Sequence, residues 1–337
     1  MTEEIAAADT AATEAAVQKF QDTMSAIRTQ LDRVIVGQDE VIEQLLVTVL
    51  VGGHCLITGL PGTAKTLMVQ SLASALGLDF KRIQFTPDLM PTDVTGTDIL
   101  ETDAGTGERS WRFVPGPVFA NVLLADEINR TPPKTQAALL EAMQEARVTI
   151  RGTTHALPAP FVVLATQNPI ELEGTYPLPE AQLDRFIFNV TLDYLDAAQE
   201  VAVVERNTLG LGLPTVEPCT DAASLVEIQS LVRQVPISDA MNRLAVDIVR
   251  ATRPDQPEAS ERVRKYVMYG ASVRAAIFLS LAARARALLK GRYHVIPEDM
   301  QTLATPVLRH RIQLNYLAES EQVTVDALIG ELASQRG

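Results

Sequence analysis

Cysteine, tryptophan and positive charge are all scarce in this 337-residue chain. The two cysteines, Cys55 and Cys219, lie far apart and form neither a metal-ligand spacing nor a disulfide framework. Aromatic residues make up only 5% of the sequence, so its core must be packed mainly with Leu, Val, Ile and Ala. The 29 basic and 42 acidic side chains give a net charge of −13, which disfavours general binding to a nucleic-acid backbone.

Long apolar runs are also absent. The longest, residues 45–51, contains Thr48 and ends at two glycines, so it falls well short of the ~18 residues of a membrane span. The first ten residues carry three acidic side chains, unlike the basic start of a secretory signal. We therefore expect a soluble cytoplasmic protein, and the chain length predicts about two domains.

The pattern of apolar residues divides the chain into four parts. Residues 1–33 carry one apolar stripe in steps of three and four, which predicts an amphipathic helix. Residues 34–195 alternate short apolar runs with helical stretches, which predicts a parallel sheet covered by helices on both faces. Residues 196–216 are expected to be a linker, and residues 217–337 a small all-α domain. The expected fold class is therefore α/β with a second, helical domain.

Two segments interrupt the alternation of strands and helices. Residues 98–113 centre on the turn at 104–107, and residues 147–158 centre on the turn at Arg151 and Gly152. Short strand-like runs flank each turn, which predicts two β-hairpins inserted into the sheet domain. Hairpins displayed on a rigid scaffold often carry function.

The strongest local signal is an eight-residue loop between an apolar strand and a helix. Its residues are Gly59, Leu60, Pro61, Gly62, Thr63, Ala64, Lys65 and Thr66. Backbone N–H groups of such a loop face bound phosphates, and the helix N-terminus favours negative charge. We expect Lys65 to reach the β- and γ-phosphates of ATP and the Thr66 hydroxyl to bind Mg²⁺. Ala64 replaces the usual glycine; we expect it in the α region, where alanine costs little.

Two further predicted strands lead into polar side chains. The run 122–125 leads into Asp126 and Glu127, at the strand end where ligands gather in α/β sheets. Because adjacent strand residues point to opposite sides, we expect Asp126 to face Mg²⁺ and Glu127 to act on the attacking water. The run 161–165 leads into Asn168, which we expect to help Glu127 hold that water.

These three elements, in this order, resemble those of the AAA+ ATPases. Longer stretches narrow the resemblance to the MoxR family, namely residues 84–91 (QFTPDLMP), 113–121 (FVPGPVFAN), 126–130 (DEINR), 136–143 (QAALLEAM) and 173–186 (EGTYPLPEAQLDRF). The likeness runs from about Val34 to about Arg311. It implies an ATP hydrolase that forms a homo-oligomeric, hexameric ring, with a P-loop αβα core, a helical lid and inserts that match the two predicted hairpins.

The resemblance also implies roles for single residues. Asn168 resembles sensor 1, and Arg185 resembles the arginine finger that reaches the nucleotide of a neighbouring subunit. Arg274 resembles sensor 2 of the lid, although Val273 stands where the family usually has proline. Residues 35–38 resemble the segment that lines the adenine pocket. The candidate residues are Lys65, Glu127, Asn168, Arg185 and Arg274 for catalysis, Gly59 to Leu67 with Val36 and Gly37 for nucleotide binding, and Thr66 and Asp126 for the metal.

The leading functional interpretation is a chaperone-like ring ATPase that remodels client proteins, because the sequence shows no second site of chemistry. The resemblance implies a partner with a von Willebrand factor A domain and a role in maturation or cofactor insertion. Two alternatives stay open, a nucleic-acid-translocating motor and an ATPase subunit like that of magnesium chelatase. Residues 259–292 carry eight Lys or Arg against the single acid Glu261, and we expect this basic stretch to face a neighbouring subunit.

Overall fold

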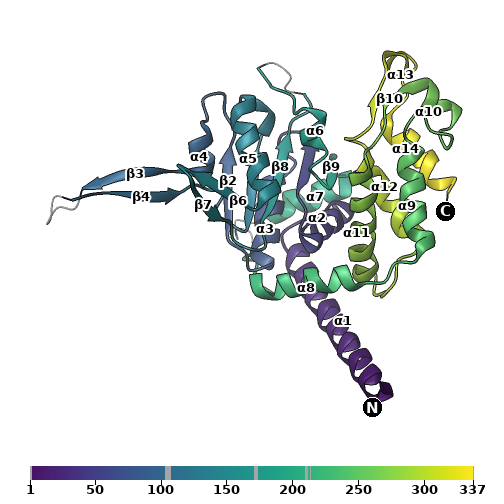
Figure 1. Ribbon diagram of the computed structural model, residues 1–337, viewed down its shortest axis with the longest axis horizontal. Helices are drawn as coiled ribbons and strands as arrows, with labels where there is room; N and C mark the ends of the chain where they lie inside the picture. Colours follow the sequence, from purple (N-terminus) through teal and green to yellow (C-terminus); the bar gives the residue numbers. More distant parts are fainter. Residues whose placement is uncertain (1, 103–107, 171–173, 209–211, 213, 337) are drawn as a thin grey trace.

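Five parallel strands form the central sheet of this computed structural model, which describes residues 2–102, 108–170, 174–208, 212 and 214–336 (Figure 1). Their order is β2-β5-β8-β1-β9, and their bounds are β1 (Cys55–Gly59), β2 (Phe80–Gln84), β5 (Val122–Asp126), β8 (Val162–Gln167) and β9 (Phe188–Leu192). Every neighbouring pair in this sheet is parallel. Both faces are covered, which is why the central strands are almost entirely apolar.

Alternate strand residues enter two different hydrophobic clusters. In β5, Val122 and Leu124 pack with α2 (Asp39–Val51) and α3 (Lys65–Ala75), whereas Leu123 packs on the other face with α4 (Pro91–Thr95) and α5 (Pro133–Glu145). This two-residue alternation is the geometry of a strand buried on both sides. The predicted layer of sheet between helices is therefore confirmed.

Two antiparallel hairpins extend from this core, as the sequence predicts. The first pairs β3 (Gly96–Thr102) with β4 (Arg109–Pro115) and projects far from the body of the molecule (Figure 1). The second pairs β6 (Arg147–Ile150) with β7 (Thr153–Ala156). The turn expected at residues 104–107 lies outside the described residues.

The amphipathic helix expected at the start of the chain is α1 (Thr2–Asp32). Its apolar stripe is buried against the core at Phe20, Met24, Ile27 and Leu31. The stripe therefore serves the chain's own core, and the N-terminal part of α1 extends beyond the body (Figure 1).

The segment expected to be a linker differs from the prediction. α7 (Ala197–Thr208) fills most of residues 196–216, and Leu209, Gly210, Leu211 and Leu213 lie outside the described residues. The glycines and proline at 210–214 dominate the sequence signal, although half of the residues of α7 are Ala or Val; none of these is fully buried.

The C-terminal part is helical, with a small exception. Its helices are α8 (Ala222–Gln234), α9 (Asp239–Arg250), α10 (Glu261–Tyr266), α11 (Val273–Leu289), α12 (Pro297–Leu308), α13 (Tyr316–Ser320) and α14 (Val325–Ser334). A short antiparallel pair, β10 (Val267–Tyr269) with β11 (Gln313–Leu314), corrects the expectation of an all-α domain. None of the helices in the described ranges has the length and hydropathy needed to cross a membrane.

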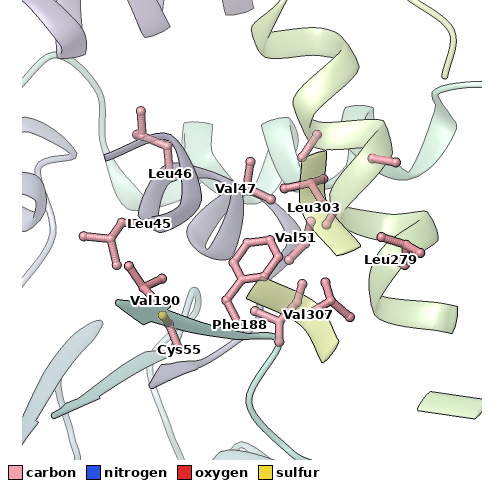
Figure 2. Close-up of a cluster of buried hydrophobic side chains, with 14 of the residues drawn as sticks. Leu45, Leu46, Val47, Val51, Cys55, Phe188, Val190, Leu279, Leu303 and Val307 are labelled. Atoms are coloured by element: carbon pink, nitrogen blue, oxygen red, sulfur yellow. The ribbon is translucent and has the colours of Figure 1, made fainter. Parts of the chain in front are cut away.

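The helical lid packs directly on the sheet domain. Figure 2 shows Phe188 of β9 between Val47 and Val51 of α2 and Leu303 and Val307 of α12. All five side chains are at most 6% exposed. The core and the lid therefore share one continuous apolar cluster.

A buried charge network reinforces this contact between lid and core. Arg286 of α11 is only 6% exposed and bonds to Asp299 of α12 (Nη1–Oδ1, 2.7 Å) and to Glu43 of α2 (Nε–Oε1, 3.1 Å). Lys290 bonds to the second oxygen of Glu43 at 2.6 Å. Arg292 adds another bond to Asp299, so this fully buried carboxylate is paired, as buried charges must be.

Candidate functional site

The loop between β1 and α3 closes around its own lysine. Lys65 is the first residue of α3, and its Nζ donates to the carbonyl oxygens of Gly59 and Leu60, both at 2.7 Å. Burial lowers the pKa of Lys65, while the nearby carboxylates of Asp126 and Glu127 oppose that shift. The lysine therefore lies at the strand end where the acidic pair also lies.

The backbone at Ala64 differs from the prediction. Its φ of 58° and ψ of 26° place it in the left-handed region rather than in the right-handed α region. Gly62 also has a positive φ, 83°, so the loop turns sharply at two positions. A Cβ in the left-handed region costs roughly 1–2 kcal/mol, which explains why glycine is usual at the position of Ala64.

The backbone turns between Asp126 and Glu127, so the two residues are not neighbours within one strand. Asp126 ends β5, but Glu127 has a left-handed φ of 56° and precedes the short helix η1 (Ile128–Arg130). The prediction that these side chains point to opposite sides assumed that both residues belong to the strand, and Glu127 does not. Glu127 Oε2 accepts from Gln84 Nε2 at 2.7 Å and from Arg130 Nη1 at 3.1 Å.

Thr166 is a component of the site that sequence reasoning missed. Its hydroxyl donates to Asp126 Oδ1 at 2.6 Å and accepts from the backbone N–H of Glu127 at 2.9 Å. Asp126 Oδ2 also pairs with Arg82 at 2.6 Å. The strand register carried the signal, because Ala125 pairs with Ala165 and the next residues, Asp126 and Thr166, therefore lie side by side.

Asn168 lies just beyond the same strand end. Its side chain is largely buried, at 8% exposure, and its Oδ1 accepts from the backbone N–H of Ile170 at 3.2 Å. Lys65, Asp126, Glu127, Thr166 and Asn168 therefore all lie at the carboxyl ends of three neighbouring strands, β1, β5 and β8. This is the edge at which open α/β sheets bind ligands.

A cavity of about 360 Å³ opens beside the loop. Its walls come from the segment before α2, from the loop and the start of α3, from the residues after β9 and from α7. The lining residues are Val34, Ile35, Val36, Gln38, Gly62, Thr63, Ala64, Leu67, Met68, Asp193, Tyr194, Leu195, Glu200, Val203, Val204, Arg206 and Asn207. Five of the predicted nucleotide-binding residues line this cavity. Its wall from α7 was missed because residues 196–216 were expected to be a linker.

Gly37 contributes to this region through its backbone. Its φ is 66°, and a Cβ there would lie 2.5 Å from Nε2 of Gln199. Among the described residues that line the cavity, Gly37 itself does not appear. It shapes the turn that carries its neighbours Val36 and Gln38.

The two predicted arginines lie elsewhere. Among the described lining residues of the cavity, neither Arg185 nor Arg274 is present. Arg185 Nη1 donates to the carbonyl oxygen of Leu140 on α5 at 2.8 Å. Arg274 pairs with Asp184, the residue before Arg185, through Nη1 and Oδ2 at 3.2 Å. The structure therefore places the predicted residues in two groups, one at the loop and one around Asp184.

The basic stretch of the lid is neutralised largely within the chain. Arg262, Lys265, Arg274, Arg286, Lys290 and Arg292 form ion pairs with acidic side chains, and Arg264 and Arg284 donate to backbone oxygens. Most of the positive charge expected at a subunit surface is thus balanced inside the chain. Of these eight residues, we retain only Arg274 as a candidate interface residue.

The fold and this site define the class of the protein. Residues 54–188 match the family model described as "ATPase family associated with various cellular activities (AAA)", and residues 259–332 match the AAA lid domain. A crystal structure of a protein from Cytophaga hutchinsonii superimposes with a TM-score of 0.89 and 41% identity, covering 98% of both chains. The class is therefore an AAA ATPase with a lid.

Sequence relatives narrow this class. The chain is 43% identical over 303 residues to "Chaperone MoxR1" of Mycobacterium tuberculosis, covering 90% of this chain and 79% of that protein. It is 45% identical over 304 residues to "Uncharacterized protein YeaC" of Bacillus subtilis, covering 90% and 91% of the two chains. Two proteins named MoxR, from Methylorubrum extorquens and Paracoccus denitrificans, are 27% and 30% identical over more than 90% of each chain. The chain belongs to the MoxR family of AAA+ ATPases.

Proposed function

We propose that this chain hydrolyses ATP at sites shared between neighbouring copies in a hexameric ring. The observation that carries the proposal is the separation of the predicted site into two groups. The loop lines the cavity and its Lys65 lies near the acidic pair, whereas Arg274 bonds to Asp184 and Arg185 follows it in the chain. A ring with head-to-tail interfaces places one such surface of each copy against the other surface of the next.

The loop group has the residues needed to bind ATP and to orient water. Lys65 and the loop N–H groups would hold the β- and γ-phosphates, while Val36 and Leu67 would contact the base or the sugar. Glu127 would accept the proton of the attacking water, with Asn168 helping to orient that water. One oxygen of the Glu127 carboxylate, Oε2, is held in this structure by Gln84 and Arg130.

The Thr66 hydroxyl and the Asp126 carboxylate would hold Mg²⁺. Both present hard oxygen ligands, which suit this ion, and the carboxylate of Asp126 is oriented by Thr166 and Arg82. When bound, the ion would neutralise negative charge on the phosphate oxygens. Thr66 and Asp126 therefore suit Mg²⁺, the ion that the family resemblance implies.

The arginine group would complete the site of the next copy. Arg185 comes two residues after the end of α6 (Glu180–Leu183). Arg274 lies in the first turn of α11. A guanidinium inserted at the transferred phosphoryl group is worth about 10³–10⁵ in rate. An isolated copy would therefore bind ATP and turn it over very slowly.

We further propose that the ring acts as a chaperone-like remodeller of client proteins. One relative at 43% identity is named a chaperone. The projecting hairpin β3–β4 exposes Leu100 and Trp111, which are 47% and 56% exposed, and such side chains can contact a client. The family resemblance extends this proposal to a von Willebrand factor A partner and to maturation or cofactor insertion.

The nucleic-acid motor is the less supported alternative. The net charge is −13, and the basic stretch of the lid is largely paired within the chain. ATP turnover measured with and without DNA or RNA at physiological salt separates the two functions. The chaperone proposal expects no stimulation, and strong stimulation would favour the motor. Neither result decides against a chelatase-like role, which a magnesium insertion assay would test.

Replacement of Glu127 tests the hydrolytic mechanism. Glu127→Gln keeps the size of the side chain but removes the base, so turnover should fall by at least about 100-fold while ATP binding persists. Glu141→Gln, which alters an exposed acid on α5, is the matched control and should retain full turnover. Unchanged turnover in Glu127→Gln would refute the assigned role. The ATP-bound Glu127→Gln ring is also the form in which a client should be captured.

A further inference from the structure

Asp184 connects the lid to the segment that carries Arg185. Its carboxylate accepts from three lid side chains, Ser272 Oγ at 3.0 Å, Arg274 Nη1 at 3.2 Å and Arg311 Nε at 2.8 Å. It directly follows the short helix α6 of the core. One core carboxylate therefore joins two separate lid segments, the start of α11 and the residues after α12.

Arg311 holds the backbone on both sides of Arg185. Its Nη2 donates to the carbonyl oxygens of Asp184, at 3.0 Å, and of Phe186. Its Nη1 also lies 3.3 Å from the carbonyl oxygen of Ile187. The Arg311 side chain is only 2% exposed, so this guanidinium is surrounded by core backbone and by Asp184.

Asp184 lies against the buried guanidinium of Arg311 as its acidic partner. Burial lowers the pKa of Arg311 to about 10, and the bond to Asp184 opposes that shift, so the guanidinium stays charged at neutral pH. Without the carboxylate, this buried cation would lose its counter-charge, and breaking such a pair is strongly unfavourable. Arg274 would lose its ion pair with Asp184 at the same time.

We propose that Asp184 is a positioning residue that fixes Arg185 and Arg274 as one unit, so that core and lid present both guanidinium groups together to the neighbouring copy. This inference rests on the proposed function, in which Arg185 acts on the nucleotide of the next copy. Asp184 itself does not touch that nucleotide. A displacement of about 1 Å at a catalytic group can cost about 100-fold in rate, so loss of the positioning residue should slow turnover strongly.

Glu43 provides a matched control. It is also a core carboxylate bonded to two lid cations, Arg286 and Lys290, and its side chain is 23% exposed against 19% for Asp184. It lies on α2, away from the Arg185 segment. Glu43→Gln and Asp184→Asn therefore break similar core–lid pairs at two different places.

The test combines steady-state turnover with direct ATP titration. We expect Asp184→Asn to lower ATP turnover by about 10–100-fold while the Kd for ATP changes less than about twofold. Asp184→Glu, which keeps the charge, should recover part of the turnover, and Glu43→Gln should lower it by less than about threefold. Urea unfolding of each variant identifies any that fails to fold. Equal losses in Asp184→Asn and Glu43→Gln would overturn the proposal, since they would indicate only a weakened lid.

Mixed rings identify the copy on which Asp184 acts. If it acts through Arg185, Asp184→Asn mixed with Lys65→Ala should regain turnover, and Asp184→Asn mixed with Arg185→Ala should not. The reverse pattern would show that Asp184 serves the site of its own chain and would overturn the proposal. The mixture of Arg185→Ala with Lys65→Ala tests the proposed function separately: if it regains turnover while Asp184→Asn mixed with Lys65→Ala does not, only the present inference fails. If it regains none, both fail.

Discussion

The loop group and the arginine group are built in different ways. The loop group consists of residues at the ends of adjacent buried strands, where each side chain follows an apolar run by one or a few positions. The arginine group brings together residues 184–185, 272–274 and 311, which are far apart in the sequence. The first group is held by the sheet, and the second by charged contacts between core and lid.

This difference predicts different sensitivities. Changes at Lys65 and the other loop residues should weaken binding of the nucleotide, whereas Glu127→Gln in the same group should lower turnover and leave binding intact. Changes in the arginine group should affect turnover and leave binding almost intact, because under the proposed function its residues act on the nucleotide of another copy.

The largest expected effect is that of Arg185→Ala. Turnover should fall by about 10³-fold or more, since a catalytic guanidinium contributes that much to phosphoryl transfer. The Kd for ATP, measured by titration, should stay nearly unchanged. Arg147→Ala, which removes an exposed arginine paired with Glu145, is the control and should retain turnover. A parallel loss of ATP binding in Arg185→Ala would place this residue in the loop group instead.

Acid should destabilise the fold at two places, because one buried neutral histidine lies directly before β1 and another lies beside Arg311. Burial lowers the pKa of His54 to about 4, and its ring lies between the Val163 N–H and the Met143 carbonyl oxygen. Burial and Arg311 hold the pKa of His310 well below its ordinary value. The folded state resists protonation while the unfolded chain binds protons below pH 6.5, so stability should fall as the pH drops from about 6.5 towards 4.

For His54 this loss should reach up to about 3 kcal/mol across that window. Urea unfolding of the wild type and of His54→Gln at several pH values measures it. The variant should be less stable at neutral pH but should lose less stability on acidification. His294→Gln, at an exposed position, should show the wild-type pH dependence. If the free energy of unfolding had the same slope against pH in His54→Gln and in the wild type, the neutral state assigned to His54 would be contradicted.

Thr166→Val should lower stability and turnover by an intermediate amount, and it should act only through residues of the loop group. The fully buried hydroxyl satisfies both Asp126 and the Glu127 N–H, and leaving such groups without a partner costs about 1–3 kcal/mol. The urea midpoint should fall accordingly, and turnover should fall with it because Glu127 is no longer fixed. Thr166→Ser keeps the hydroxyl and should restore most of both. If Val and Ser behaved alike, the hydroxyl bridge would have no role.

The smallest expected effect is a gain in stability from Ala64→Gly. Glycine adopts the left-handed backbone without the Cβ penalty, but it also raises the entropy of the unfolded chain, so the net gain should be about 0.5–1 kcal/mol. Ala327→Gly, at an exposed helical position of α14, should instead destabilise by about 0.5–1 kcal/mol. A higher free energy of unfolding for Ala64→Gly and a lower one for Ala327→Gly would support the left-handed backbone at Ala64. A lower free energy of unfolding in both variants would contradict it.

Much of the loop group was predictable from the sequence. A strand, a glycine-containing loop and a helix form a contiguous pattern, and the acidic pair follows its own apolar run. Thr166 was missed because its role depends on the register between β5 and β8, which a single sequence does not contain. The left-handed backbone of Ala64 and Glu127 was missed for a similar reason, since tertiary context overrides the preference of these residue types.

The arginine group was predictable only in part. The family motif indicated Arg185 and Arg274 as single residues, but nothing in their local sequences indicates that Asp184 links them. That contact depends on how the lid packs on β9 and α2, which is set by side chains such as Phe188 and Leu303 (Figure 2). The wall of the cavity from α7 was missed because the glycines and the proline at 210–214 marked residues 196–216 as a linker, although α7 itself is amphipathic.

Turnover by an equimolar mixture of Lys65→Ala and Arg185→Ala tests the shared site most directly. Each variant alone should be nearly inactive, because one lacks the loop lysine and the other lacks the arginine. In randomly mixed rings, about a quarter of the interfaces would join an intact loop group to an intact Arg185, so about a quarter of wild-type turnover should return. A mixture that stays as inactive as its two components would contradict a site shared between copies.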